Sequence, residues 1–324
     1  MSAWGWGPAR IKKKMHQKLA ITATLTVSVL FLTGAATSRQ QPDAAPKKPW
    51  VIGHRGASAY APENTIPAFQ LAAEQGATFV EFDLQLTKDK QIVCLHDTSL
   101  ERTTDVEQVF PDRSRPGTGA GAKPAWMLSD FTLAEVKRLD AGAWFDAKFR
   151  GTRIPTFGET IDAMRGKTGL FIEVKSPELY EGIERLILAQ LRSRGLDTPW
   201  ADSRTPVVIQ SFSLTSLKIF TGTLKTTLPI HFLYGASDAA AYAKPEALVG
   251  MKSFATGISP EKVVLEKYPD AMKQAKDIGL LITPYTFRAA AVTGYPDVTA
   301  EMRYYIDTLK VDGVITDNPD LVPR

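Results

Sequence analysis

Two carboxylates stand two positions apart within an otherwise apolar run. Glu81 and Asp83 alternate with apolar residues, so in a β-strand both carboxylates point to one face of the strand. If that face is buried, the two carboxylates repel each other unless a cation or a proton lies between them. A hard divalent metal with oxygen ligands would remove this repulsion. The alternation therefore predicts a metal site on this strand.

The same alternation recurs at Glu173 and Lys175, with Phe171 on the same face. On a neighbouring inner strand, Glu173 can supply a third carboxylate, and Lys175 can lie where a phosphate oxygen binds. The alternative interpretation is that Glu81, Asp83 and the second pair form an ion-pair network without a metal. The histidines of the chain favour the metal.

Two of the four histidines stand at the ends of predicted strands, at His54 and His96. In a barrel the carboxyl ends of all strands converge on one mouth. Two histidines at such a mouth can act as base and acid on the two sides of a phosphodiester. Arg55 can neutralise the negative charge that develops on the phosphoryl oxygens. His231 lies within an apolar run and is expected to be a core or surface residue, whereas His16 belongs to the N-terminal segment.

From Trp50 onward, short β-branched runs alternate with amphipathic stretches, which is typical of repeated parallel βα units. The predicted strands are residues 51–54, 79–84, 170–175, 207–212, 230–234, 255–259, 281–287 and 313–316. They suffice to close a (β/α)8 TIM barrel of the α/β class. Helices are predicted to begin at Thr132 and Thr156, which each precede a Glu by three residues, and at Ser259-Pro260-Glu261.

Residues 91–96 interrupt this alternation, because only a short polar turn around Lys88-Asp89 separates them from residues 79–86. A parallel crossover needs a longer connection, so an antiparallel hairpin is predicted. With a two-residue turn, His96 would fall opposite Glu81 or Asp83. After the hairpin, residues 97 to about 169 form an insertion that follows the second strand. This insertion either shapes the substrate entrance or is a packing embellishment.

Composition excludes several classes of protein. The chain has 324 residues, a net charge of +4 and a single cysteine, Cys94. One cysteine excludes an intrachain disulfide framework. Apart from Lys12-Lys13-Lys14 the basic residues are scattered, so no binding of nucleic acid is expected.

The N-terminal segment has the layout of a secretory signal. A basic stretch up to Lys18 precedes the uncharged apolar residues 19–32 and a small-residue segment that ends at Ala36. We expect cleavage near Ala36, residues 1–45 to be signal peptide and linker, and residues 46–324 to form the barrel domain. No stable membrane insertion is then expected. The alternative is an uncleaved membrane anchor, since the apolar run approaches spanning length.

A series of short motifs resembles the ordered signature of glycerophosphodiester phosphodiesterases. The motifs are Gly53-His54-Arg55-Gly56, Pro62-Glu63-Asn64-Thr65, Glu81-Phe82-Asp83, His96-Asp97, Glu173-Val174-Lys175, Ser211-Phe212 and Gly313-Val314-Ile315-Thr316-Asp317. The resemblance extends from residue 51 to residue 321. It implies a (β/α)8 phosphodiesterase barrel, metal ligation by Glu81, Asp83 and Glu173, and catalysis by His54 and His96.

One further motif is similar to the exported bacterial branch of that family, namely Tyr285-Thr286-Phe287-Arg288 preceded by Gly257-Ile258-Ser259-Pro260. This resemblance implies a periplasmic or secreted protein, in agreement with the signal segment. It also implies Ca²⁺ as the metal, although oxygen ligands also suit Mg²⁺. Tyr285 and Arg288 are candidate contacts for glycerol or phosphate. Glu63 and Asn64 are expected to orient the first loop or to cap the first helix.

The expected reaction is metal-dependent hydrolysis of a small glycerophosphodiester to sn-glycerol 3-phosphate and an alcohol. Arg55 and Lys175 would share the phosphate charge, and His54 and His96 would be acid and base in an order left open. Two alternatives remain: a related phosphodiesterase acting on lysolipids or cell-wall polymers, and a non-catalytic barrel that binds a phosphodiester. The aromatic residues that would provide a more apolar mouth for lipids are Trp126, Trp144, Phe145 and Phe149.

Overall fold

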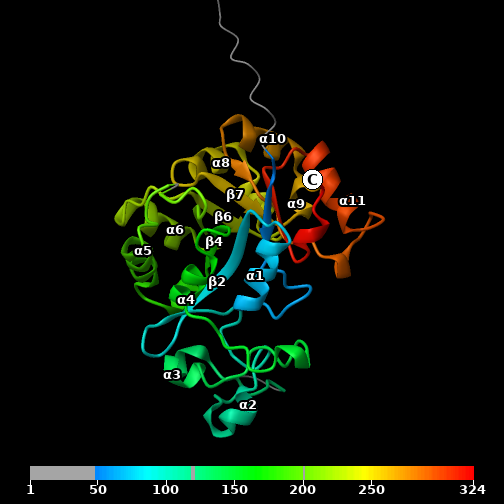
Figure 1. Ribbon diagram of the computed structural model, residues 1–324. Helices are drawn as coiled ribbons and strands as arrows, with labels where there is room; N and C mark the ends of the chain where they lie inside the picture. Colours follow the sequence, from blue (N-terminus) through cyan, green and yellow to red (C-terminus); the bar gives the residue numbers. More distant parts are fainter. Residues whose placement is uncertain (1–47, 118–120, 200) are drawn as a thin grey trace, which may run out of the picture. The chain divides into compact units, whose positions relative to one another are not determined.

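Parallel strands alternate with helices in the computed structural model, which describes residues 48–117, 121–199 and 201–324 (Figure 1). The strands are β1 (Trp50–Gly53), β2 (Phe79–Leu86), β3 (Ile92–Cys94), β4 (Gly169–Val174), β5 (Val207–Ser211), β6 (Ile230–Tyr234), β7 (Gly257–Pro260), β8 (Leu281–Ile282) and β9 (Gly313–Thr316). The α-helices are α1 (Ile66–Glu74), α2 (Val106–Val109), α3 (Leu133–Val136), α4 (Phe157–Met164), α5 (Ile183–Ser193), α6 (Leu214–Lys218), α7 (Ala239–Tyr242), α8 (Pro245–Lys252), α9 (Val263–Lys267), α10 (Pro269–Asp277) and α11 (Val298–Arg303). The predicted signal peptide and linker, residues 1–45, lie outside the described residues.

The strands form one sheet in the order β8-β7-β6-β5-β4-β2-β1-β9, with every neighbouring pair on this path parallel. Beyond β8 the chain runs beside β9: Ile315 N donates to Pro284 O, and Phe287 N donates to Ile315 O, each at 3.0 Å. These bonds nearly close the sheet into a barrel of eight parallel strands, and helices surround it (Figure 1). The predicted (β/α)8 barrel is confirmed.

The alternation in the sequence separates two buried surfaces. On β2, Val80 and Phe82 belong to the large core beneath the helices, whereas Phe79 belongs to a second core inside the barrel. The members of this inner core are Ile52, Phe79, Phe171, Val208 and Ile315. Because side chains alternate along a strand, the carboxylates that follow Phe79 on the same face form the next layer toward the carboxyl ends of the strands.

His231 occupies the inner core and is fully buried. Its ring centroid lies 5.3 Å from that of Phe171, and its Nδ1 lies 3.0 Å from Thr283 Oγ1. Burial lowers the pKa of His231 to about 3, so the ring is neutral at physiological pH. The expectation of a core histidine is therefore confirmed.

The hairpin is present, but its predicted register is wrong. Strand β3 pairs antiparallel with β2 and places Leu84 opposite Cys94. Thr87 N donates to Gln91 O at 3.0 Å, and Lys90 takes a left-handed φ of 60°. The turn therefore contains three residues and not two, which shifts the pairing by one position. His96 lies beyond the end of β3, outside the ladder.

Two other predicted boundaries are wrong. Strand β8 ends at Ile282, because the chain reaches Pro284, which has no N–H to donate to a ladder. No helix begins at Ser259, which lies in β7, and α9 starts only at Val263. The Ser259 hydroxyl lies 2.8 Å from Thr283 Oγ1 inside the barrel, so it does not cap a helix.

The insertion between β3 and α4 contains a small core of its own. Its buried residues include Leu100, Trp126, Leu128, Phe131 and Leu139. Both predicted capping boxes are confirmed, at Thr132 before α3 and at Thr156 before α4. In Figure 1, α2 and α3 lie together at one end of the barrel.

Among the described residues, no helix combines the length and apolar character needed to cross a membrane.

Candidate active site

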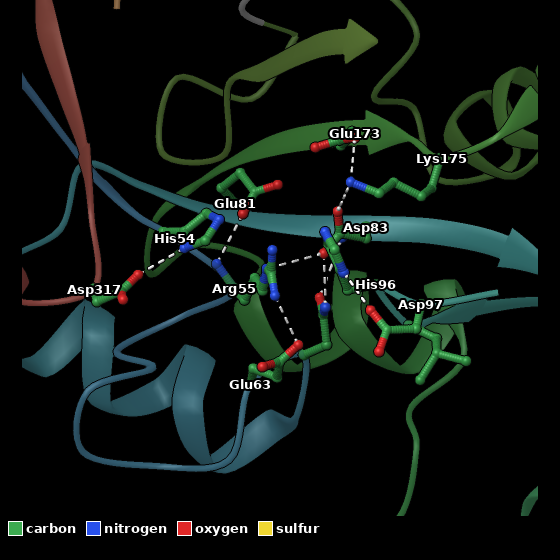
Figure 2. Close-up of polar contacts among 12 residues, drawn as sticks. His54, Arg55, Glu63, Glu81, Asp83, His96, Asp97, Glu173, Lys175 and Asp317 are labelled. Atoms are coloured by element: carbon green, nitrogen blue, oxygen red, sulfur yellow. Dashed lines mark hydrogen bonds and ion pairs between the residues drawn. The ribbon is translucent and has the colours of Figure 1, made fainter. Parts of the chain in front are cut away.

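Three buried carboxylates meet at the mouth of the barrel (Figure 2). Asp83 on β2 is the direct register partner of Glu173 on β4, and Glu81 lies one step back on the same face of β2. Only 1% of Glu81, 1% of Asp83 and 6% of Glu173 is exposed to solvent. One oxygen of each carboxylate lies within 4.8 Å of the others. The structure thus brings the three predicted metal ligands together.

Two cations contact this cluster. Lys175 Nζ lies 2.9 Å from Glu173 Oε1 and 3.5 Å from Asp83 Oδ1. The Arg55 backbone N–H donates to Glu81 Oε2 at 2.8 Å, and Arg55 Nε lies 3.5 Å from Asp83 Oδ2. Lys175 therefore forms ion pairs with Asp83 and Glu173, as the alternative without a metal requires, whereas Glu81 is held by a backbone N–H, so the three carboxylates are compensated unequally.

The pKa values of the three carboxyl groups differ because nearby positive charge compensates them unequally. Burial opposes ionisation of Asp83, but the charges of Lys175 and Arg55 outweigh burial and hold its pKa below the usual range. Burial raises the pKa of Glu81 well above its ordinary value, and the charge of Asp83 raises it further. Burial also raises the pKa of Glu173, against the effect of Lys175. The two cations thus stabilise Asp83 as an anion, whereas Glu81 and Glu173 lack enough positive charge.

A divalent metal fits this arrangement. Three carboxylates form an oxygen-only donor set, which suits Ca²⁺ or Mg²⁺. Among the residues that the structure describes, Gln210 is the one side chain found to reach Glu81 Oε1, and its Nε2 lies 3.5 Å away. Gln210 Oε1 is buried without a hydrogen-bond partner within the described part of the chain. Oxygen atoms left with weak or no partners inside the barrel are available to a cation or to its water ligands.

The loop after β1 places His54 and Arg55 over the cluster. Arg55 and Gly56 both have left-handed backbone conformations, with φ of 54° and 88°. A Cβ at Gly56 would lie 2.5 Å from the backbone carbon of Ala68 in α1, so only glycine fits there. This turn directs the Arg55 N–H toward Glu81 while the His54 side chain enters the mouth.

Each histidine is paired with an aspartate. His54 Nδ1 lies 2.6 Å from Asp317 Oδ1, and His96 Nδ1 lies 2.6 Å from Asp97 Oδ1. When Nδ1–H donates to a carboxylate, Nε2 is left as the free nitrogen of the ring. Burial, followed by the charge of Arg55, lowers the pKa of His54, against the effect of Asp317. His54 is therefore neutral at pH 7 in the metal-free protein.

Both histidines line one cavity of about 130 Å³. Every predicted site residue except Asp83 also contributes to its wall, and Asp83 contacts the lining residues Arg55 and Lys175. The lining residues are His54, Arg55, Glu81, His96, Glu173, Lys175, Gln210, Phe212, Leu233, Tyr285, Thr286, Arg288 and Ile315. A second cavity of about 370 Å³ shares Glu173, Lys175 and Phe212 with the first. The hairpin thus brings His96 beside the carboxylates despite its shifted register.

Sequence reasoning missed the roles of three polar residues. Asp317 and Asp97 bind the histidines, and Gln210 reaches Glu81. Glu63 orients the first loop, as expected, because it accepts a hydrogen bond from Arg55 Nη1 at 2.9 Å. The adjacency of Asp97 to His96 could have indicated the pairing of these two residues. Asp317 stands 263 positions from His54, and only the end of β9 beside β1 brings the two together.

Known proteins share this architecture. The glycerophosphoryl diester phosphodiesterase family matches residues 54–321. A glycerophosphodiester phosphodiesterase of Bacillus subtilis (strain 168) is 33% identical over 285 residues, which cover 86% of each of the two chains. A crystal structure of an Agrobacterium tumefaciens str. C58 glycerophosphodiester phosphodiesterase is similar with a TM-score of 0.61 at 26% identity, covering 85% of this chain and 98% of that chain. An Oleispira antarctica phosphodiesterase in complex with the product sn-glycerol-3-phosphate has a TM-score of 0.65 at 25% identity, covering 84% and 94%.

If the carboxylate cluster binds a metal, Ca²⁺ or Mg²⁺ will stabilise the metal-stripped protein. A ligand present at 100 times its Kd adds about 2.7 kcal/mol to the free energy of unfolding, so the melting temperature rises on titration. Glu173→Gln removes one charged ligand and should abolish most of this rise. Glu246→Gln, at an exposed position in the first turn of α8, is the matched control and should retain it. An equal metal-induced shift in both variants would contradict a site at Glu173.

Proposed function

Because the chain belongs to the glycerophosphoryl diester phosphodiesterase family and is an enzyme of that type, we propose that it hydrolyses small glycerophosphodiesters with a divalent metal and with two histidines as acid and base. The observation that carries the proposal is the pairing of two histidines, each held by an aspartate, in one cavity with three buried carboxylates. The products would be sn-glycerol 3-phosphate and a free alcohol. The Oleispira relative, which binds this phosphate product, supports that choice.

Glu81, Asp83 and Glu173 would hold the metal, and a bound cation would withdraw negative charge from a phosphoryl oxygen. Ca²⁺ is our proposed metal, with Mg²⁺ as the alternative for the same ligands. Arg55 and Lys175 would hold further phosphoryl oxygens. Support for this comes from their position in the wall of the cavity and from their contacts with the carboxylates. Arginine and lysine at such positions stabilise the charge that builds up around phosphorus.

We assign the base to His54 and the acid to His96. A base must be unprotonated before the reaction, and the pKa of buried His54 is lowered. His54 Nε2 then takes the proton of the attacking hydroxyl as its oxygen bonds to phosphorus. The bond from phosphorus to the leaving alcohol oxygen breaks, and that oxygen receives a proton from His96. The net change is the addition of one water across the P–O bond, whether water or a glycerol hydroxyl attacks first.

The two adjoining cavities favour a small diester over a lipid. Together they offer a compact substrate two adjoining spaces, which share Glu173, Lys175 and Phe212 in their walls. Neither cavity is lined by the aromatic residues that the lysolipid alternative required. Trp126 is buried in the core of the insertion, and Trp144 packs edge-on against Phe145. These residues therefore give no apolar wall to the site.

Activity assays test the proposal directly. Release of glycerol 3-phosphate from glycerophosphocholine should stop with EDTA and return with Ca²⁺ or Mg²⁺. His54→Ala and His96→Ala should each lower kcat by about 10²- to 10⁴-fold, the usual contribution of general acid–base catalysis. His231→Gln, in the inner core, serves as the histidine control and should retain activity per folded molecule. The proposal fails if folded, metal-loaded wild-type protein releases no glycerol 3-phosphate from any glycerophosphodiester.

The pairing of His54 with Asp317 predicts a pH effect. The carboxylate raises the pKa of His54, so Asp317→Asn should lower that pKa further. A base works above its pKa, and the acidic limb of kcat/KM should therefore move to lower pH. The plateau should also fall by about 10²-fold or more, because the ring loses the group that fixes its tautomer. Asp320→Asn is the control, since exposed Asp320 contacts Tyr60 and not His54. An acidic limb that stays in place would remove His54 as the base.

We further propose that the enzyme is exported, as a member of the exported bacterial branch, and acts in the periplasm or outside the cell. Support comes from the basic, apolar and small residues in order before Ala36, and the resemblance of residues 285–288 to the exported branch adds to it. Expression of the full chain in a Gram-negative host should yield a periplasmic protein whose mass corresponds to cleavage near Ala36. A membrane-bound product with an intact N-terminus would support an uncleaved anchor instead.

A further inference from the structure

One arginine of the insertion connects two parts of the active site. The guanidinium of Arg102 lies between two carboxylates, those of Asp97 and Glu63. Its Nε donates to Asp97 Oδ2 at 2.5 Å and its Nη2 to Asp97 Oδ1 at 3.2 Å. Its Nη1 donates to Glu63 Oε2 at 2.8 Å and its Nη2 to Glu63 Oε1 at 2.7 Å. The planar fork of an arginine suits such paired contacts, and a lysine cannot reproduce them.

Each of the two carboxylates also holds a residue of the proposed site. Asp97 binds His96 Nδ1 at 2.6 Å, and Glu63 accepts from Arg55 Nη1 at 2.9 Å. The loop after β3 carries His96, Asp97 and Arg102. The segment between β1 and α1 carries Arg55 and Glu63. Arg102 therefore joins the loop that carries the acid to the loop that binds phosphate.

Arg102 acts at a distance from the substrate. It is not among the residues that line the cavity of the two histidines, and 43% of its side chain is exposed. Arg55, in contrast, lines the cavity and contacts Asp83. Within the described part of the chain, the side chains found in contact with the Asp97 carboxylate are those of His96 and Arg102. Of the contacts found among the described residues, the one with the His96 ring would alone orient the Asp97 carboxylate if Arg102 were removed.

We propose that Arg102 is a positioning residue for the hydrolysis, and that through it the insertion is a working part of the active site. One guanidinium fixes Asp97 and Glu63 together, and they in turn fix the ring of His96 and the fork of Arg55. The insertion was expected either to shape the entrance or to be a packing embellishment. Its main role is instead to hold His96, the proposed acid, in position through its first turn. The inference rests on the proposed roles of His96 and Arg55.

The test compares Arg102 with a second arginine of the same insertion. Arg115 donates to both oxygens of Asp130 at 2.6 Å and is 56% exposed, and none of the contacts found for Asp130 is with a site residue. Arg102→Gln should lower kcat on glycerophosphocholine by about 10- to 100-fold, the usual effect of removing a residue that orients a ligand or catalytic group. Arg115→Gln should leave kcat within about twofold, inside the usual range for a surface substitution.

A double-mutant cycle separates positioning from general destabilisation. If Arg102 acts through Asp97, then Arg102→Gln should add little to the loss caused by Asp97→Asn, because the two changes break one connection. Guanidinium ion at concentrations that leave the melting temperature unchanged should restore part of the activity of Arg102→Ala and none to Asp97→Asn. Should Arg102→Gln fail to fold, Arg102→Lys keeps the charge, and it should still lose kcat because it lacks the fork.

Full kcat in folded Arg102→Gln, or losses from Asp97→Asn and Arg102→Gln that simply multiply, would overturn the assignment. Either result would leave the proposed hydrolysis intact, since it concerns the wild-type enzyme and its histidines. A folded, metal-loaded wild-type protein without activity would instead refute the proposed hydrolysis, and with it the role assigned to Arg102.

Discussion

The burial of three carboxylates at the end of an apolar barrel is the constraint around which the mouth of this protein is organised. Each carboxylate has lost most of its water, and such charges persist inside a protein only when paired with cations or hydrogen-bond donors. The partners come from loops and strand ends: the Arg55 N–H donates to Glu81, and Asn64 Nδ2 donates to Asp83 at 2.8 Å. Arg55, Asn64 and Ser176 all have left-handed φ values, of 54°, 57° and 42°. These three are half of the six non-glycine residues with positive φ found among the described residues, and strained backbone of this kind is common at functional sites.

The barrel interior consists of two layers of different chemistry, and the lower layer makes the upper one effective. Phe79, Phe171 and neutral His231 fill the interior beneath the carboxylates. This packing excludes water from below, so the charges above it interact in a medium of low polarity, where electrostatic forces are stronger. Side-chain alternation on β2 and β4 therefore produces both layers. On each strand, an inward-facing phenylalanine belongs to the packed lower layer, and the inward-facing acids that follow it belong to the carboxylate layer.

The sequence was sufficient to predict whatever depends on local alternation or on the position of a residue at a strand end. This covers the barrel, the faces of β2 and β4, and the convergence of His54, His96 and the three carboxylates. The sequence was insufficient where the outcome depends on one extra residue in a turn, as in the β2–β3 hairpin. It was also insufficient where two hydrogen-bond partners compete for one group: the Ser259 hydroxyl bonds within the barrel and does not cap a helix. Contacts such as His54–Asp317 and Arg102–Glu63 join loops that are distant in sequence, and no local pattern encodes them.

The two histidine–aspartate pairs have the same form but different surroundings, and this difference bears on how one site can hold both an acid and a base. Each aspartate is also held by an arginine: Asp317 Oδ2 lies 3.2 Å from Arg288 Nε, and Asp97 Oδ2 lies 2.5 Å from Arg102 Nε. An arginine beside the carboxylate keeps it ionised, so the aspartate orients the ring without taking its proton. The side chain of His54 is 12% exposed and that of His96 is 28% exposed. Burial and the charge of Arg55 disfavour a proton on His54, whereas the ring of His96 is more open to solvent. In the proposed mechanism, this difference in depth is why His54 is assigned as the base and His96 as the acid.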